Sequence, residues 1–122
     1  MTPIELQARR EALGLSQSLL AAVLDVKQAT ISRWESGDRG IPEFAESRIV
    51  DMENAVESLI ERMLALATEH GADVLIVHGD DAAFWRAHPE MDGWPAALQR
   101  VAAARALVEA RDEARFLSIM SA

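Results

Sequence analysis

The 122-residue chain contains no cysteine, the first of several absences that narrow its possible functions. Without thiols, it can form neither a disulfide framework nor a thiolate metal site, and thiol catalysis is excluded. The longest apolar run, residues 19–24, is far shorter than the ~20 residues that a membrane span needs. The first ten residues carry charges of both signs and lack the apolar segment of a signal peptide. We therefore expect a soluble, cytoplasmic protein that does not enter a membrane.

The patterns of common catalytic sites are missing as well. The chain has no Gly-rich phosphate loop and no Ser in a recognisable nucleophile context. The three histidines, His70, His78 and His88, are spaced by eight and ten residues, which does not place them on one helix face as metal ligands. The paired carboxylates Asp80 and Asp81 are explained by the start of a helix. We therefore expect no enzyme, no metal site and no cofactor.

The formal net charge of −8 is unevenly distributed along the chain. Residues 1–40 hold five basic and five acidic side chains, whereas residues 41–122 hold seven and fifteen. An acidic second part weakens non-specific attraction to a phosphate backbone and leaves selection to site-specific contacts. The charge therefore does not exclude DNA as a partner.

The first 41 residues are predicted to form three short helices with clear start and stop signals. Thr2 and Ser16 are suitable N-caps for the first two helices, and Gly14 and Gly37 are suitable stops for the first and third. The predicted spans are residues 3–13, 17–24 and about 28–35.

The segment of residues 42–70 has no Gly or Pro after Pro42 and is predicted to be helical. We expect one long helix or two helices end to end. Its apolar residues recur at helical steps and are Phe44, Ile49, Met52, Val56, Leu59, Met63 and Leu66. This stripe can serve either an internal core or a dimer contact.

Residues 74–77 form the only convincing strand in the sequence. Because a lone strand leaves its backbone groups unpaired, it needs a partner, and its twofold copy in a second chain would supply one. We therefore predict that Val74, Leu75, Ile76 and Val77 contribute to dimerisation.

Two further helices are predicted beyond the strand. Asp80 or Asp81 is a suitable cap for a short helix that ends near Ala87. Pro95 is expected to open an Ala-rich helix that continues to about Ser118.

The strongest functional signal is the segment LSQSLLAAVLDVKQATISRWESG at residues 15–37. It resembles the helix-turn-helix of the phage-repressor-like family, which includes the lambda, 434 and Xre-type repressors. The resemblance spans roughly residues 3–40, and it departs from the family where Asp25 replaces the usual turn glycine. Asp tolerates a left-handed backbone better than most residues, so we expect the turn to be kept.

The resemblance also assigns structural roles within the motif. Ala21 takes the small-residue position where the two helices cross, and Val26 follows the turn. Arg10 is expected to pair with Glu35 across the domain. The predicted structural residues are Arg10, Ala21, Val26, Ile31, Trp34 and Glu35.

In this family the second helix of the motif enters the major groove. The solvent-facing positions of that helix are Gln28, Ala29, Thr30, Ser32 and Arg33. Gln can bond adenine and Arg can bond guanine at two atoms each, while Ala and the Thr methyl suit the thymine methyl group. Thr30 and Ser32 are alternatively plain solvated side chains. Gln17, Lys27 and Arg39 are the expected phosphate contacts.

A narrower resemblance extends over most of the chain. The segments LQA at residues 6–8, WESG at 34–37, IP at 41–42, FWRAHP at 84–89 and GW at 93–94 are similar to YdiL-like proteins and anti-CRISPR-associated repressors. These join a repressor-type headpiece to a compact dimerisation domain and are homodimeric autorepressors of inverted-repeat promoters. The resemblance implies that Trp85 and Trp94 are core or dimer-interface residues, as burial preferences also favour.

The predicted fold is mainly α, with a lambda-repressor-like headpiece and a small C-terminal dimerisation region that contains one short strand. Its expected divisions are a helix-turn-helix core at residues 1–41, a connecting and dimerisation helix at 42–70, and an α+β dimerisation domain at 71–122. The predicted function is a homodimeric (auto)repressor, bacterial or phage-borne, that binds a pseudo-palindromic operator in double-stranded DNA. Three alternatives stay open: an antitoxin paired with a toxin, an interaction adaptor without DNA binding, and a binder of folded RNA.

Overall fold

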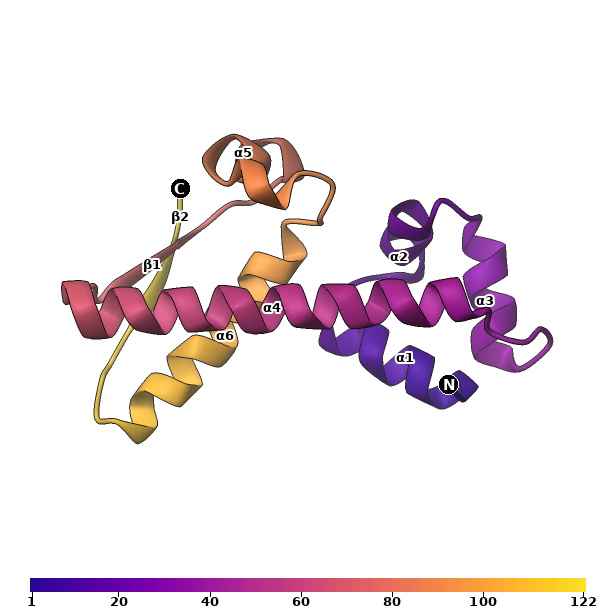
Figure 1. Ribbon diagram of the computed structural model, residues 1–122, viewed down its shortest axis with the longest axis horizontal. Helices are drawn as coiled ribbons and strands as arrows, with labels where there is room; N and C mark the ends of the chain where they lie inside the picture. The colour runs from indigo at the N-terminus through magenta and orange to yellow at the C-terminus, as the bar shows by residue number, and fades with distance from the viewer. The chain divides into compact units, whose positions relative to one another are not determined.

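The computed structural model describes residues 1–122 and confirms a mainly helical fold (Figure 1). Its helices are α1 (Pro3–Ala12), α2 (Gln17–Leu24), α3 (Gln28–Ser36), α4 (Glu43–His70), α5 (Asp81–Ala87) and α6 (Ala97–Asp112), with the 3-10 helix η1 (Pro89–Met91). Two short strands, β1 (Val74–Val77) and β2 (Ser118–Ser121), complete the structure. The chain divides into an amino-terminal unit, Met1–Asn54, and a carboxy-terminal unit, Ala55–Ala122. No helix combines the length and the apolar character that crossing a membrane requires.

The local signals in the amino-terminal unit act as the sequence predicts. The Thr2 side chain accepts a hydrogen bond from the Glu5 amide at 3.2 Å, and Ser16 Oγ accepts one from the Leu19 amide at 3.1 Å. Each bond satisfies an amide that the first turn of a helix leaves without a partner. Asp25 ends α2 with φ 54° and ψ 47°, so the left-handed turn is kept without the glycine.

The core of the amino-terminal unit is formed by the apolar faces of α1 to α3 and the start of α4. Leu6, Leu20, Ile31 and Ile49 are completely buried, and Trp34 is 3% exposed. Burying a Leu or Ile side chain contributes about 1.5–3 kcal/mol, so these side chains are the main stabilisation of a unit of this size.

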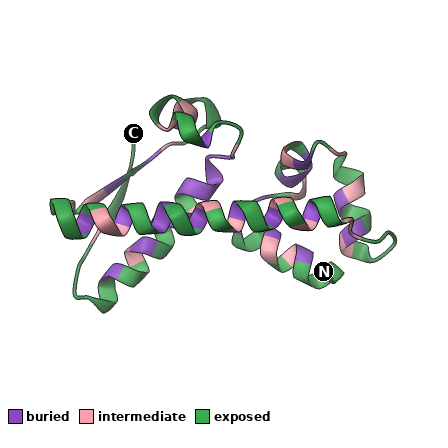
Figure 2. Ribbon diagram, in the orientation of Figure 1, coloured by how far each residue is buried: buried purple, intermediate pink, exposed green.

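The long helix α4 is continuous, and its residues belong to both units. The predicted apolar stripe is buried within the chain at Ile49, Met52, Val56, Leu59 and Met63, and Figure 2 shows buried positions recurring between exposed ones along the helix. The stripe therefore faces an internal core over this length.

The two ends of the predicted stripe lie outside this buried face in a single chain. Phe44 is 50% exposed and Leu66 is 48% exposed, while the neighbouring Ala45 and Ala67 are buried. A four-residue step from Ile49 leads to position 45 rather than 44, and helical periodicity decides the face more strictly than side-chain size does.

The expectation of a single strand was also wrong, because β2 pairs with β1 inside the same chain. The pairing is parallel, with Leu75 opposite Ile119 and Val77 opposite Ser121. The predicted last helix ends at Asp112 instead of about Ser118. Ala114 has a left-handed φ of 57°, and the chain turns there toward β2. No Gly or Pro marks this turn, so sequence signals carried the predicted helix too far.

The core of the carboxy-terminal unit is rich in small side chains. α6 packs against both strands. Its buried alanines are Ala97, Ala102, Ala103, Ala106 and Ala110. Phe84 and Leu98 are completely buried beside this surface of short side chains. The short α5 is capped as predicted, since Asp80 Oδ1 accepts a hydrogen bond from the Ala83 amide at 2.8 Å.

Candidate nucleic-acid interface

The helix α3 separates its residues clearly into a buried face and an exposed face. Ile31 and Trp34 lie three positions apart and pack into the core. The opposite face carries four exposed residues, Gln28, Ala29, Ser32 and Arg33, and the half-buried Thr30. The structure therefore brings all five predicted base-reading candidates onto the accessible surface of one helix.

Beneath that face lies an ion pair between α1 and α3. Arg10 donates from Nε to Glu35 Oε2 at 2.7 Å and from Nη2 to Glu35 Oε1 at 2.9 Å. Its remaining terminal nitrogen donates to the Leu15 carbonyl at 2.8 Å. The two side chains are only 10% and 7% exposed, so this two-point pair fixes α3 against α1 in a region shielded from solvent.

The ion pair is linked to the surface by two glutamines. Gln17 Nε2 donates to Glu35 Oε1 at 3.3 Å, and Gln28 Nε2 donates to Gln17 Oε1 at 3.2 Å. A chain of hydrogen bonds thus runs from the buried Arg10 to Gln28 at the start of α3. Gln28 keeps its Oε1 and one N–H free, which are the two groups that an adenine edge requires.

Protonation of the network follows from these contacts. Burial by itself would raise the pKa of Glu35, but the hydrogen bonds from Arg10 and Gln17 outweigh it, and the pKa of Glu35 lies below its usual value. The hydrogen bond to Glu35 raises the pKa of Arg10. Both groups are therefore charged at neutral pH.

The basic side chains of this unit fall into two groups. Arg9 is paired with Glu53, with Nε donating to Oε2 at 3.0 Å, Arg10 is paired with Glu35, and Arg48 with Asp51. Lys27, Arg33 and Arg39 are exposed and form no ion pair with the chain. These three cations are therefore available to an external anion or base.

The start of α2 offers a further group of donors. Ser16 occupies the Leu19 amide, which leaves the amides of Gln17 and Ser18 unpaired at the positive end of the helix. Such amides bind phosphates well. The sequence prediction included Gln17 but omitted Ser18, although its position directly after the N-cap and Gln17 was visible in the sequence.

The remaining motif residues stabilise the turn. Ala21 is 4% exposed, and its carbonyl accepts a hydrogen bond from the Val26 amide at 3.0 Å across the left-handed Asp25. A small side chain at position 21 allows the two helices to approach closely.

The residues predicted to form a dimer contact differ in their exposure. Leu75 and Val77 are buried in the carboxy-terminal unit, whereas Ile76 is 49% exposed. Trp85 and Trp94 are half-buried, and Trp85 Nε1 donates to the Trp94 carbonyl at 2.7 Å. The structure therefore joins the two tryptophans within one chain.

Gln99, which is 2% exposed, was not predicted from the sequence. It lies between His78 and His88, whose ring centroids are 5.8 Å apart. Gln99 lies three, four and seven positions before the buried Ala102, Ala103 and Ala106 of α6, which places it on the same helix face. This spacing could have indicated from the sequence that Gln99 is buried. No three potential metal-ligating side chains lie together anywhere in the structure.

Comparison with known proteins agrees with this geometry. Residues 6–48 match the family model of the helix-turn-helix, a span that runs from α1 into α4 and includes all of α3. The match supports a DNA-binding, transcription-regulating helix-turn-helix in this part of the chain. No curated protein matches the chain.

Proposed function

We propose that the protein is a homodimeric repressor that binds an inverted-repeat operator, including one in its own promoter, and inserts α3 into the major groove. The observation that carries this proposal is the exposed face of α3. On this face Gln28 is held by the hydrogen-bond network that begins at Arg10, while Arg33 forms no ion pair. Such a regulator acts where the DNA is, so we place it in the cytoplasm.

In this proposal the base contacts come from the first turns of α3. Gln28 presents an acceptor and a donor to adenine, and Arg33 reaches O6 and N7 of guanine. Ala29 and the Thr30 methyl contact thymine methyl groups, and Ser32 bonds to a neighbouring base edge.

The phosphate contacts surround this face. The amide and side chain of Gln17 bind one phosphate at the start of α2, and Lys27 and Arg39 neutralise others. These contacts fix the register of the headpiece on the duplex without reading its sequence. Because only a few cations are free, we expect a shallow dependence of affinity on salt.

Two headpieces are needed because an inverted repeat has two half-sites, about 34 Å or a multiple of it apart. We assign residues 1–41 to DNA binding, residues 42–70 to the connecting helix, and residues 71–122 to dimerisation. In this assignment the buried side chains of Leu75 and Val77 anchor β1 to the core of the carboxy-terminal unit. Ile76 and the half-buried Trp85 and Trp94 belong to the surface that remains available for contact.

A feature of β2 supports the dimer. All four of its residues are exposed, its outer edge has no partner strand, and it carries neither a charge nor a proline that would block pairing. Antiparallel addition of β2 from a second copy would extend the two-stranded sheet to four strands. Exposed Phe116 and Met120 would be covered in the same contact.

The test is fluorescence anisotropy of the full chain on its own upstream DNA and on a scrambled duplex, over a salt series. We expect tight binding to the native duplex alone. Arg33→Ala should cost about 1–3 kcal/mol on that duplex and little on the scrambled one. Arg111→Ala, which removes an exposed arginine of the carboxy-terminal unit, is the control. Equal weakening on both duplexes would show that Arg33 does not read bases.

A further inference from the structure

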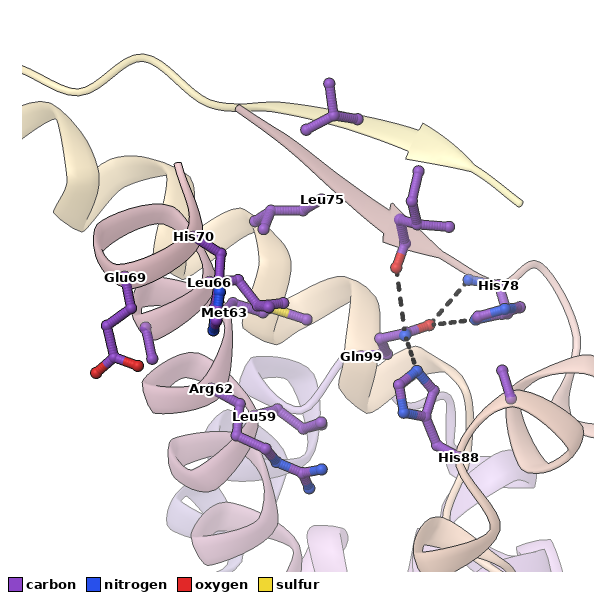
Figure 3. Close-up of a pocket in the computed structure, with 14 residues that line it drawn as sticks. Leu59, Arg62, Met63, Leu66, Glu69, His70, Leu75, His78, His88 and Gln99 are labelled. Carbon is purple, nitrogen blue, oxygen red and sulfur yellow. Dashed lines mark hydrogen bonds between the residues drawn. The ribbon is translucent and has the colours of Figure 1, made fainter. Parts of the chain in front are cut away.

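The carboxy-terminal unit contains a cavity of about 640 Å³ that the proposed DNA contacts do not use. One wall is formed by Leu59, Met63 and Leu66 of α4, and the opposite wall by β1, with Gln99 and His88 at one end (Figure 3). Its volume lies in the range of about 300–1,000 Å³ that is typical of small-molecule sites, and its apolar walls with a few polar groups are typical as well.

The wall at β1 is a free strand edge. β2 occupies the edge that carries the Asp73 and Val77 carbonyls, which accept from the Ser118 and Ala122 amides at 3.0 and 2.9 Å. Because main-chain groups alternate along a strand, Val74 and Ile76 direct their backbone groups toward the other edge.

On that free edge, one donor–acceptor pair is already occupied by the amide of Gln99. Its Oε1 accepts from the His78 amide at 2.8 Å, and its Nε2 donates to the Ile76 carbonyl at 3.4 Å (Figure 3). A primary amide can make both bonds because its oxygen and one of its N–H groups point to the same side. The side chain thus takes the place of a neighbouring strand.

The next pair along the same edge is equivalent and unoccupied. It consists of the Val74 carbonyl and the Ile76 amide, which have the same spacing along the strand as the Ile76 carbonyl and the His78 amide. No group of the chain bonds to either of them, and both residues line the cavity. The edge therefore offers one acceptor and one donor beside an apolar wall.

We propose that this cavity binds a small molecule with an apolar body and one primary amide or lactam. The N–H of the ligand donates to the Val74 carbonyl, and its C=O accepts from the Ile76 amide, as Gln99 does one step along the strand. The apolar body lies against Leu59, Met63 and Leu66. Regulation of operator binding by such a ligand rests on the proposed function, whereas binding of the ligand to the cavity does not.

The experiment uses the full chain without DNA and two probes, 4-phenylbutanamide and methyl 4-phenylbutanoate. The ester keeps the carbonyl and the apolar body but has no N–H. We expect the amide to bind about three- to tenfold more tightly, as the loss of one hydrogen bond predicts. In ¹H–¹⁵N spectra, the Ile76 amide signal should move on addition of the amide. Equal affinity for both probes, or an unmoved Ile76 signal, would overturn the proposal.

Matched variants distinguish binding in the cavity from binding elsewhere on the chain. Leu66→Trp fills the cavity wall from an exposed position and should abolish binding of the amide. Val108→Trp makes the same change at another exposed residue of the unit, outside the cavity, and should leave binding unchanged. If Leu66→Trp instead dissociates a dimer and the amide competes with dimerisation, the cavity belongs to a second copy and the proposal fails. Loss of DNA binding alone would leave the probe results unaffected.

Discussion

Replacement of Glu35 by Gln tests how the recognition helix is held. The substitution keeps the shape of the side chain but removes the charge that accepts two hydrogen bonds from Arg10 and one from Gln17. Arg10 then stays 10% exposed without its counter-charge, and Glu11, 3.7 Å away and 57% exposed, compensates only weakly.

The magnitude follows from the burial of the pair. Removing one partner of a buried ion pair costs about 3–5 kcal/mol. Because Arg10 keeps its bond to the Leu15 carbonyl, we expect the lower end, about 3 kcal/mol in the free energy of unfolding of the amino-terminal unit. The matched control is Glu53→Gln, which breaks the Arg9 pair. That pair is 28% and 35% exposed, and its loss should cost only about 0–1 kcal/mol.

Urea titration followed by the indole N–H signal of Trp34 measures this unit specifically. Trp34 is 3% exposed and packs in the same core, so its signal reports unfolding of the headpiece. Glu35→Gln should shift the midpoint far more than Glu53→Gln does. Equal destabilisation by the two variants would refute the reasoning that burial makes the Arg10–Glu35 pair decisive.

Two further predictions concern pH and assembly. Because the pKa of Glu35 is lowered by folding, its contribution is fully present above the unfolded value of about 4.3 and is lost as the pH falls through the lower folded value. Acid titration of stability should therefore show a steeper loss below pH ~4 in the native chain than in Glu35→Gln, and parallel curves would contradict this. Ile119→Pro removes an amide from the outer edge of β2 and should shift sedimentation from dimer to monomer. Ile119→Ala keeps the amide and should remain dimeric, whereas a dimer in both variants would exclude the β2 edge.

The amino-terminal unit was predictable because its signals are local. Thr2 and Ser16 mark helix starts by their own side chains, and Gly37 marks a stop with a φ of 82°. At Asp25 the family resemblance predicted the turn, and the tolerance of Asp for left-handed geometry explained why the turn is kept without glycine. The exposure of Gln28 and Arg33 follows from the positions of Ile31 and Trp34 on the opposite face.

The carboxy-terminal unit depends on partners that are distant in sequence. β1 pairs with residues more than forty positions later, and no turn residue marks the end of α6 at Asp112. Gln99 stands in an Ala-rich helix, and its role becomes visible only when β1 lies beside it. Long-range pairing of this kind leaves no periodic signal, so the sequence could predict neither the sheet nor the cavity.

Sequence-specific binding through α3 can be tested directly by a ¹H–¹⁵N titration of the full chain with its own upstream DNA. We predict that the largest shifts occur at the exposed face of α3, at Gln28, Ser32 and Arg33, and at the start of α2, at Gln17 and Ser18. We also predict that these shifts are absent with a scrambled duplex at the same salt concentration. Shifts confined to the carboxy-terminal unit, or identical shifts with both duplexes, would contradict sequence-specific binding through α3.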